Sequence, residues 1–294
     1  MPVSSSGPGS KGASASSTGS DSGQESDAVE KPKGDALPIN ELFYSIQGEG
    51  TLAGVPSVFV RTSGCNLRCW FCDSYHTSWE PTHAWMNLDD IVSEIQSFEE
   101  ANHVVLTGGE PMLHDESVTL LEQLDELGYH TTVETNGTIF RDAPIDLASI
   151  SPKLENSTPT PERDPRGEVP KESRDGDRWP AGALNRDEGE FESKHERDRI
   201  DLESMSRLLE TSDFQLKFVV TGEDDMPEIL SLLEDLRSES SVPITANDVL
   251  LMPEGATRER LAETRTRVAE LAMDHGFRYT PRLHVDLWND APET

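Results

Sequence analysis

Short apolar stretches typical of β-strands alternate with amphipathic helical stretches through most of this chain. A strand that is followed by a helix and then by another strand normally returns parallel to the first, so the alternation predicts a parallel sheet covered by helices. A closed barrel of eight such units takes about 250 residues, more than the folded part of this chain offers. We therefore expect an α/β fold built as a partial, open barrel. The predicted strands cover 55–62, 103–111, 129–137, 214–222 and 248–255, and the predicted helices cover 88–98, 117–128, 226–238 and 258–276.

Three cysteines follow the first of these strands. Cys65, Cys69 and Cys72 have the spacing C-x3-C-x2-C, and an odd number of cysteines so close together is no disulfide framework and fits a reducing compartment. Thiolates are soft ligands suited to iron–sulfur clusters and to zinc. Structural zinc takes four protein ligands, so zinc would need His76 or another residue to complete the site. A four-iron cluster on three cysteines leaves one iron open to a small molecule, and this interpretation is favoured.

The strand at 103–111 ends in a second candidate element, Thr107-Gly108-Gly109-Glu110-Pro111. Glycines at a strand end let the backbone approach a ligand closely, and strand ends are where α/β folds place their sites. Alone, this segment could be a tight turn. Together with the cysteine motif it resembles the radical S-adenosylmethionine (SAM) superfamily, in which the amino and carboxylate groups of SAM occupy the open iron. The resemblance implies the partial, open TIM-like barrel of the radical SAM type.

Further stretches narrow the resemblance to one family. From about residue 41 to the C-terminus, apart from one interruption, the chain resembles the 7-carboxy-7-deazaguanine synthase family. IQGEG before the cysteine motif is the specific marker, whereas TGGEP is shared across the superfamily. The matching stretches are ELFYSIQGEG (41–50), VFVRTSGCNLRCWFCDS (58–74), LTGGEPM (106–112), VETNGT (133–138), SPK (151–153), LKFVV (216–220), LMPEG (251–255) and PRLHVDLW (281–288).

The resemblance implies a role for each matching residue and three cofactors: a [4Fe-4S] cluster, SAM and Mg²⁺. Strand-end carbonyls and Glu110 would accept hydrogen bonds from the ammonium group of SAM. The threonine that usually follows Cys-Asp in the family is Ser74 here, which keeps the hydroxyl group for magnesium. The implied ligands are Cys65, Cys69 and Cys72 for the cluster, Ser74 for Mg²⁺, Gly109, Glu110, Glu134, Asn136, Ser151 and Lys153 for SAM, and Gln47, Glu49 and Arg61 for the pterin substrate.

Simpler explanations are available for several charged and aromatic residues. Glu134 could cap a loop, Lys153 or Lys217 could be a surface charge, and Arg61 could pair with a structural acid. His284 and Trp288 near the C-terminus are as compatible with ordinary packing as with a site. The sequence leaves these alternatives open.

The reaction that the resemblance implies is the conversion of 6-carboxy-5,6,7,8-tetrahydropterin to 7-carboxy-7-deazaguanine with loss of ammonia. The product would serve the queuosine or archaeosine nucleosides of tRNA. A donor such as a flavodoxin or ferredoxin would reduce the cluster, which passes an electron to SAM, while the protein binds, orients and excludes water. A homodimer is expected. The alternatives are an activating enzyme that makes a glycyl radical on a partner protein, against which IQGEG argues, and a zinc-binding interaction protein.

Acidic residues dominate the charge of the chain. Asp and Glu number 56 against 25 Lys and Arg, a net charge of -31, and such a surface disfavours direct binding of nucleic acid. The acids are spread along the chain, which favours a halophilic surface over a docking face for one basic partner. No apolar run reaches the roughly 20 residues of a membrane span, and the N-terminus lacks a signal-peptide pattern. We expect a cytoplasmic protein without a membrane partner.

Two stretches fall outside the alternating pattern. Residues 1–35 are rich in Ser, Gly and charged side chains and nearly devoid of large apolar ones, which predicts a disordered tail. Residues 36–294 would form the radical SAM domain. This domain is interrupted at about 155–199 by a stretch rich in Pro, Gly, Arg and acids. We interpret that stretch as a solvated insertion, with an active-site lid as the alternative.

The excess of acids makes the stability of the protein depend on salt. The Debye length falls from about 10 Å at 0.1 M to about 3 Å at 1 M salt, which suppresses repulsion between the surplus carboxylates. We expect the melting temperature to rise by roughly 10 °C or more over this range of KCl, equivalent to about 3–5 kcal/mol of stability for a domain of this size. Differential scanning fluorimetry measures it. An unchanged melting temperature would favour the basic-partner interpretation instead.

Overall fold

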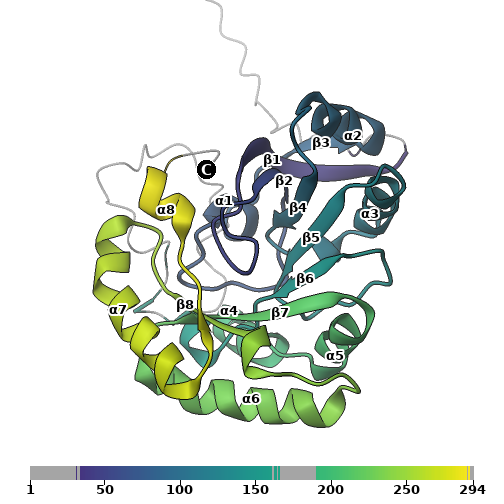
Figure 1. Ribbon diagram of the computed structural model, residues 1–294. Coiled ribbons are helices and arrows are strands. Elements are labelled where there is room, and N and C mark those ends of the chain that lie inside the picture. Colours follow the sequence, from purple (N-terminus) through teal and green to yellow (C-terminus); the bar gives the residue numbers. More distant parts are fainter. Residues whose placement is uncertain are drawn as a thin grey trace, which may run out of the picture. The chain divides into compact units, whose positions relative to one another are not determined.

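A nine-stranded sheet is the central element of the part of the chain that the structure describes (Figure 1). The structure is a computed structural model that describes residues 31, 34–160, 162–163, 165, 190–289 and 291. Across the sheet the strands follow the order β3-β1-β2-β4-β5-β6-β7-β8-β9. The strands are β1 Ala36–Ile46, β2 Pro56–Thr62, β3 Ala84–Asn87, β4 His103–Gly108, β5 His130–Thr135, β6 Leu147–Ile150, β7 Asp213–Val220, β8 Val249–Pro253 and β9 Arg278–Tyr279.

The strands are parallel, as the alternating sequence pattern predicts, except at one edge of the sheet. Each neighbouring pair from β2 to β9 is parallel, and β3 and β9 end the order without pairing to each other among the described residues. The predicted open α/β barrel is confirmed. Only β1 runs antiparallel to its neighbours, β2 and β3. The link from β1 to β2, residues 47–55, is shorter than the dozen or more residues that a parallel crossover requires.

Helices cover the outer side of the curved sheet. Figure 1 shows α2, α3, α5, α6 and α7 arranged along this side. The longest described helix, α7, begins after Thr257, whose side chain accepts from the Arg260 N–H, and ends at Gly276 with a positive φ of 68°, so both ends carry their expected caps. The helices are α1 Tyr75–Ser78, α2 Leu88–Ser97, α3 Glu116–Glu126, α4 Glu190–Asp198, α5 Leu202–Thr211, α6 Met226–Glu239, α7 Arg258–His275 and α8 Leu283–Trp288.

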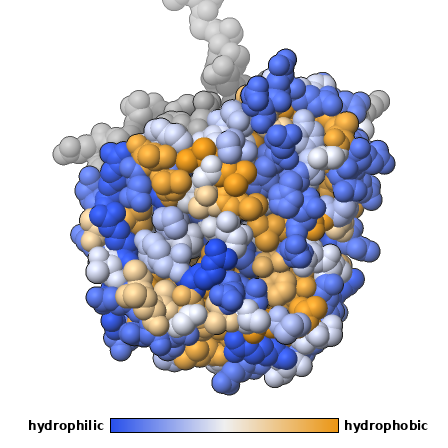
Figure 2. Space-filling view, in the orientation of Figure 1, coloured by the Kyte–Doolittle hydropathy of each residue, from blue (hydrophilic) through white to orange (hydrophobic). Residues whose placement is uncertain are grey.

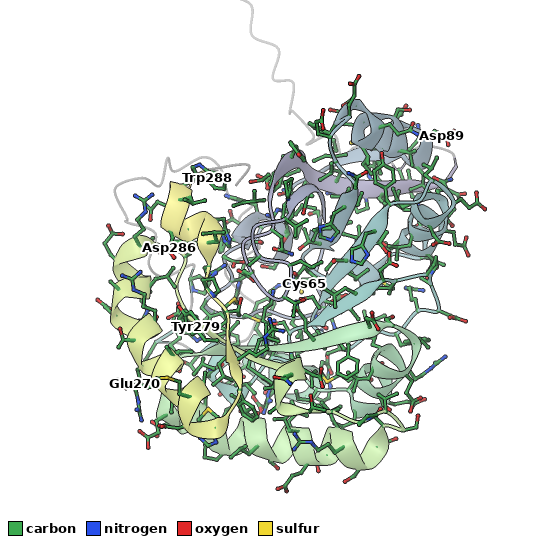
Figure 3. All side chains as sticks on the ribbon, in the orientation of Figure 1. Cys65, Asp89, Glu270, Tyr279, Asp286 and Trp288 are labelled. Atoms are coloured by element: carbon green, nitrogen blue, oxygen red, sulfur yellow. The ribbon has the colours of Figure 1, made fainter. Side chains whose placement is uncertain are left out.

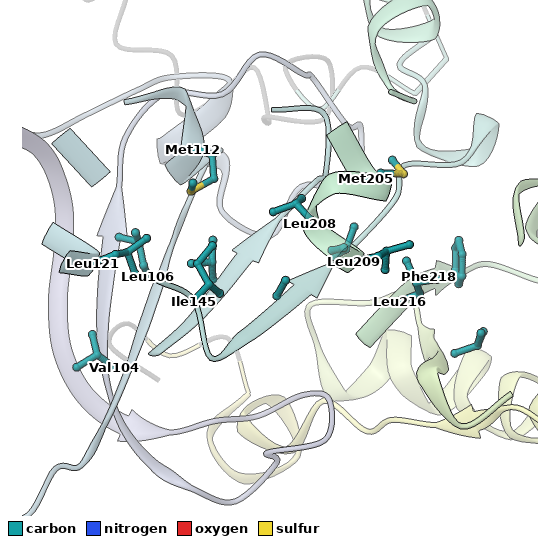
Figure 4. Packing of buried hydrophobic residues seen from close by; sticks show 14 of the residues in the cluster. Val104, Leu106, Met112, Leu121, Ile145, Met205, Leu208, Leu209, Leu216 and Phe218 are labelled. Atoms are coloured by element: carbon teal, nitrogen blue, oxygen red, sulfur yellow. The ribbon is translucent and has the colours of Figure 1, made fainter. Parts of the chain in front are cut away.

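The core lies between the sheet and these helices (Figure 4). On β7, Leu216 and Phe218 are fully buried and belong to this core, and on α5 Leu208 packs into the same cluster. Successive residues of a strand face opposite sides of the sheet. Gln215 and Lys217, which alternate with these apolar residues, therefore face the inner side and are nevertheless buried.

The same alternation places polar residues on the inner face of β5 and β6. Val133 and Ala148 belong to the outer core, whereas their neighbours Glu134 and Ser149 face inward and are bonded to each other at 2.9 Å. A buried inner face that is polar on three adjacent strands cannot be a packing core, because each buried polar group requires a partner. The inner face of the sheet is therefore the place to look for a site.

The ends of the predicted insertion are ordered parts of the fold. Residues 155–157 form a 3-10 helix, and Glu190–Asp198 form α4, so the structure differs from the predicted boundaries of 155–199 on both sides. The side chain of His195 on α4 is 1% exposed. A solvated segment would bury no such residue. Most of the remaining insertion, and residues 1–30 of the predicted tail, lie outside the described residues.

Hydrophilic residues cover much of the molecular face seen in Figure 2. This pattern agrees with the acidic composition. Within the described ranges, no helix combines the length and the apolar character that crossing a bilayer requires.

Candidate active site

The cysteine motif lies in the loop that follows β2. Cys65, Cys69 and Cys72 all line one cavity, with a volume of about 530 Å³. Figure 3 shows Cys65 in the hollow of the curved sheet. All three cysteines are free thiols. One loop thus brings three soft ligands to a single cavity of the size that holds a small-molecule ligand.

Two backbone contacts hold the cysteine loop against the end of β4. The Glu110 N–H donates to the Gly64 carbonyl at 2.9 Å, and the Gly109 N–H donates to the Thr62 carbonyl at 3.2 Å. A Cβ atom on Gly109 would lie 2.2 Å from the Gly64 carbonyl oxygen, so only glycine fits this position. The glycines of TGGEP do allow a close backbone approach, as the sequence predicts, and the cysteine loop is one neighbour that approaches.

Glu110 does not line the cavity. Its carboxylate is fully buried and accepts hydrogen bonds from Met112 N (3.1 Å), Thr135 Oγ1 (2.8 Å) and Asn136 N (2.7 Å). Burial raises the pKa of Glu110, although these bonds act in the opposite direction. This placement differs from the expected contact between Glu110 and the ammonium group of SAM. The carboxylate instead fastens the end of β4 to the end of β5.

Burial dominates the electrostatics of the three thiols. It raises the pKa of Cys65 to about 12, and it also raises the pKa of Cys69 and of Cys72. Hydrogen bonds from Leu67 N to Cys65 Sγ (3.4 Å) and from Ser78 Oγ to Cys72 Sγ (3.1 Å) favour the thiolates. Because burial outweighs these bonds, thiolates here need a positive charge beside them, as a bound metal centre supplies.

A chain of paired charges, with its two cations buried, forms much of the polar lining. Lys217 Nζ donates to Glu49 at 2.7 Å and to Glu134 at 2.8 Å. Arg282 donates to the other Glu49 oxygen at 2.9 Å and also to Asp73. The side chains of Lys217 and Arg282 are only 4% and 7% exposed, so each cation depends on its carboxylates. From the cysteine loop to β5 the order is Asp73, Arg282, Glu49, Lys217 and Glu134.

The two cations fix the charge of their carboxylate partners. Burial alone raises the pKa of Glu49, but the charges of Lys217 and Arg282 outweigh it and hold that pKa well below its usual range. Arg282 likewise lowers the pKa of Asp73 against the effect of burial. Burial lowers the pKa of both cations, and the carboxylates more than reverse this. All four groups are therefore charged at neutral pH.

The IQGEG loop packs directly against the C-terminal segment. The Gly48 carbonyl accepts from the Leu283 N–H at 2.8 Å. A Cβ atom on Gly48 would lie 1.9 Å from His284 Nδ1, so a larger residue would displace this histidine. The glycine thereby lets the loop that carries Glu49 come within hydrogen-bonding distance of Arg282. Two motifs more than 230 residues apart thus build one side of the cavity.

Comparison with known proteins gives a consistent picture. Residues 59–153 match the model of the Radical SAM superfamily. The chain is 63% identical to a 7-carboxy-7-deazaguanine synthase from Halobacterium salinarum over 89% of this chain and 94% of that relative. It is 37% identical to one from Rhodopirellula baltica over 85% of this chain and 86% of that relative. The chain belongs to the 7-carboxy-7-deazaguanine synthase family.

A solved structure supports the fold of this family member. The structure of QueE from Escherichia coli superimposes with a TM-score of 0.56 at 23% identity, covering 85% of this chain and 95% of that one. At this identity the likeness concerns the fold. The expected radical SAM barrel and the observed open sheet therefore agree.

The structure of this 7-carboxy-7-deazaguanine synthase family member brings nearly all of the predicted site residues to one cavity. They come from the loop after β1, the end of β2, the cysteine loop, and the ends of β4, β5 and β6. Their shared location follows from the parallel strands, whose carboxyl ends meet at one edge. Glu110 is the exception. The predicted residues that line the cavity are Gln47, Glu49, Arg61, Cys65, Cys69, Cys72, Ser74, Gly109, Glu134, Asn136, Ser151 and Lys153.

Arg61 lines the cavity but is already paired. Its Nε donates to Glu41 at 2.9 Å and its Nη1 to the Ser74 hydroxyl at 2.8 Å. The alternative that Arg61 pairs with an acid therefore holds in this state. The partner Glu41 also lines the cavity, so the pair is part of the site rather than remote from it.

Lys217, Arg282 and His284 are among the cavity residues that lie outside the predicted site set. The sequence alone is compatible with Lys217 as a surface charge and with His284 as a packing residue, and it assigns no role to Arg282. All three line the cavity. The sequence does carry a signal for Lys217. A lysine inside the apolar run LKFVV lies on a central strand that is covered on both faces, so its side chain must be buried and paired with an acid.

A single zinc ion has no suitable ligand set in the described part of the chain. No three or more His, Cys, Asp or Glu side chains of those residues are grouped to hold one metal ion. The zinc hypothesis therefore gains no support from the arrangement.

Lys217 can be tested by its replacement with methionine. Lys217→Met leaves Glu49 and Glu134 as buried carboxylates without their shared cation, and we expect a loss of about 3–5 kcal/mol in the free energy of unfolding at pH 7. Without the lowering effect of Lys217, the pKa of the Glu49 carboxyl rises in the variant, so part of the loss should be recovered as the pH falls towards 5. Urea unfolding in molar KCl measures both.

The control is Arg265→Met. Arg265 pairs with Asp286 on the surface, with 51% of its side chain exposed, and such a pair contributes at most about 1 kcal/mol. Equal losses in the two variants would contradict the view that the buried charge chain holds the site together.

Proposed function

We propose that this chain converts 6-carboxy-5,6,7,8-tetrahydropterin to 7-carboxy-7-deazaguanine with loss of ammonia, as a lyase of the radical SAM type. One observation carries the proposal. A single cavity joins the three thiols of the cysteine loop to the Gln47 and Glu49 side chains of the IQGEG loop. A cluster site and a polar binding surface for a second molecule therefore share one space.

The donor set fits a [4Fe-4S] cluster. Cys65, Cys69 and Cys72 would hold it, because they are the three soft ligands of the cavity and their burial disfavours thiolates that lack a positive partner. When bound, the cluster and SAM supply the radical chemistry that removes a hydrogen atom from the substrate. The protein's own part is to bind, to orient and to keep water out.

Residues at the ends of β4 to β6 would bind SAM. Lys153 Nζ lies 2.6 Å from Ser151 Oγ, so an ammonium and a hydroxyl are available together for the carboxylate of SAM. The backbone at Gly109 and the side chain of Asn136 line the cavity beside Cys65. Glu134 contributes a carboxylate that can accept from ribose hydroxyls. Glu110 would act indirectly, by fixing the strand ends that carry these groups.

The substrate would bind between the IQGEG loop and Arg61. The pterin ring presents amide and amino N–H groups, which match the ionised carboxylate of Glu49 and the amide of Gln47. The substrate carboxylate requires a cationic partner, and a guanidinium matches it with two parallel hydrogen bonds. Arg61 can provide them if it exchanges its bond with Glu41 for one with the substrate. His284, which lies next to Glu49, lines the same side of the cavity.

Magnesium fits this arrangement poorly. Ser74 Oγ accepts from Arg61 at 2.8 Å and donates to Asp73 at 3.3 Å, and Asp73 is paired with Arg282. A cation bound at Ser74 would meet two guanidinium groups, whereas Mg²⁺ requires several oxygen ligands in a near-octahedral arrangement. These side chains do not fit the ion as arranged.

Several finer features belong to the same proposal. A one-electron donor such as a flavodoxin or ferredoxin would reduce the cluster. A homodimer and a role in supplying queuosine or archaeosine follow from the family resemblance. The salt-adapted surface is supported by the net charge of -31 and by the similarity to a protein from Halobacterium salinarum. The glycyl-radical activating enzyme is disfavoured, since the relatives are named as 7-carboxy-7-deazaguanine synthases.

Turnover by the reconstituted protein tests the proposed reaction. After anaerobic reconstitution with iron and sulfide, we expect product from the carboxytetrahydropterin, SAM and a reductant, measured by liquid chromatography and mass spectrometry. Cys69→Ala should lose the iron-dependent absorbance, SAM cleavage and product together, because two thiolates leave one corner of the cluster unbound. A Cys69→Ala protein with full iron content and activity would refute the cluster assignment.

Arg61 and Glu49 test the substrate assignment. Arg61→Lys cannot make two parallel bonds to a carboxylate, so we expect substrate binding to weaken by about 1–3 kcal/mol while uncoupled SAM cleavage persists. Glu49→Gln should likewise impair turnover. Arg141→Lys is the control, since Arg141 pairs with Asp115 outside the cavity. Unchanged kinetics in both site variants would leave a radical SAM enzyme with a different substrate.

A further inference from the structure

A buried histidine on α4 contacts the cysteine loop from within the stretch predicted as an insertion. The side chain of His195 is 1% exposed, and its Nδ1 lies 3.1 Å from the backbone nitrogen of Arg68. Arg68 stands between Cys65 and Cys69 in the loop. The contact joins segments 127 residues apart, so it is not a local turn or cap.

The hydrogen bonds of His195 define one tautomer. A backbone N–H can only donate, so Nδ1 accepts from Arg68 and the proton resides on Nε2. Nε2 then donates to Ser157 Oγ at 2.9 Å, and the Ser157 hydroxyl donates to the Leu154 carbonyl at 2.6 Å. Burial lowers the pKa of His195 to about 4, in keeping with a neutral ring. Each polar atom of this histidine has a defined partner.

The same neighbourhood holds the loop at two other points. The backbone N–H of Trp70 donates to the Ser157 carbonyl at 3.1 Å, and its indole N–H donates to the Asn156 carbonyl at 2.6 Å. Lys194, next to His195, donates to the Asn66 carbonyl at 2.8 Å. The backbone of the cysteine loop is thus anchored at Asn66, Arg68 and Trp70.

We infer that His195 is a positioning residue for the cluster-binding loop, acting through the backbone of Arg68. A loop that presents three thiols to one cluster must hold their spacing, and contacts from outside the loop add to its few internal hydrogen bonds in doing so. The inference rests on the proposed function only in taking Cys65, Cys69 and Cys72 as cluster ligands. It assigns a role to the returning end of the insertion.

Two substitutions separate the two bonds of the ring. The oxygen of His195→Asn can stand near the Nδ1 position and keep an acceptor for the Arg68 N–H, whereas the longer side chain of His195→Gln reaches towards Ser157 and leaves that N–H unpaired. A histidine that serves only to fill the core would be replaced equally well or equally badly by both. The positioning role predicts a difference between them.

The measurement is the alkylation rate of each cysteine in the folded, reduced apoprotein, followed by peptide mass spectrometry in molar KCl. We expect His195→Gln to speed the alkylation of Cys69 about tenfold, the change that corresponds to about 1.4 kcal/mol and to one lost hydrogen bond. His195→Asn should stay within about threefold of the parent, by the same conversion. After reconstitution, iron loss to a chelator should follow the same order.

His103 provides a matched control. It is 3% exposed, and its ring nitrogens contact Ser57 Oγ at 2.7 Å and Thr132 Oγ1 at 2.8 Å, at strand residues that do not line the cavity. His103→Gln should lower the melting temperature without changing alkylation of the folded protein.

Parental alkylation rates in both His195 variants, or equal acceleration in His195→Gln and His103→Gln, would overturn the inference. Because the thiols of the apoprotein are measured, this failure is distinct from failure of the proposed reaction. A parent protein with protected thiols but no turnover would count against the reaction alone.

Discussion

The interior of this protein depends on a chain of alternating charges. Lys217 and Arg282 are both nearly inaccessible to solvent, and a buried cation is tolerated only where carboxylates approach it with good geometry. Glu49 is bonded to both cations. Its carboxylate therefore joins a central strand, the IQGEG loop and the C-terminal segment. None of these parts can move away without leaving a charge unpaired, so the cavity requires the strand, the loop and the C-terminal segment to be in place together.

The sequence predicts the architecture because the alternation of strands and helices along the chain is a strong signal of a parallel sheet. A buried central strand appears as a short apolar run, and the helices between strands force parallel pairing. The antiparallel direction of β1 does not follow from its composition, because it is set by the short link at 47–55. A charged residue inside an apolar run predicts a buried charge that needs a partner. Lys217 within FQLKFVV could be neither exposed nor unpaired, yet its partners on other strands cannot be found from spacing alone.

The sequence predicts which residues lie around the cavity, but it predicts less well which partners their side chains contact. The motifs placed nearly every residue around one cavity, since strand ends of a parallel sheet converge. The position of a residue at such a strand end does not determine where its side chain points. Glu110 follows two glycines and does not line the cavity; its carboxylate accepts hydrogen bonds from Met112, Thr135 and Asn136 instead. His195 could not be predicted, because a stretch rich in Pro, Gly and charge gave no sign that its last turns return to the cysteine loop.

The distribution of charge suggests why an acidic exterior and an ionic active site can coexist. Exposed carboxylates repel one another through water and respond to salt, whereas buried pairs are screened far less. High salt would therefore relieve the repulsion that accompanies a net charge of -31 and leave the bonds between Glu49 and its two cations almost unchanged. The negative exterior also repels an anionic partner and favours a cationic or neutral one. A substrate that carries a carboxylate must then be drawn in by a local cation. Arg61, Lys217 and Arg282 line the cavity, but they already pair with the carboxylates of Glu41, Glu49, Glu134 and Asp73, which line it too. An anionic ligand would therefore bind through Lys153, which donates to the Ser151 hydroxyl, or through Arg61 if it exchanges its bond with Glu41.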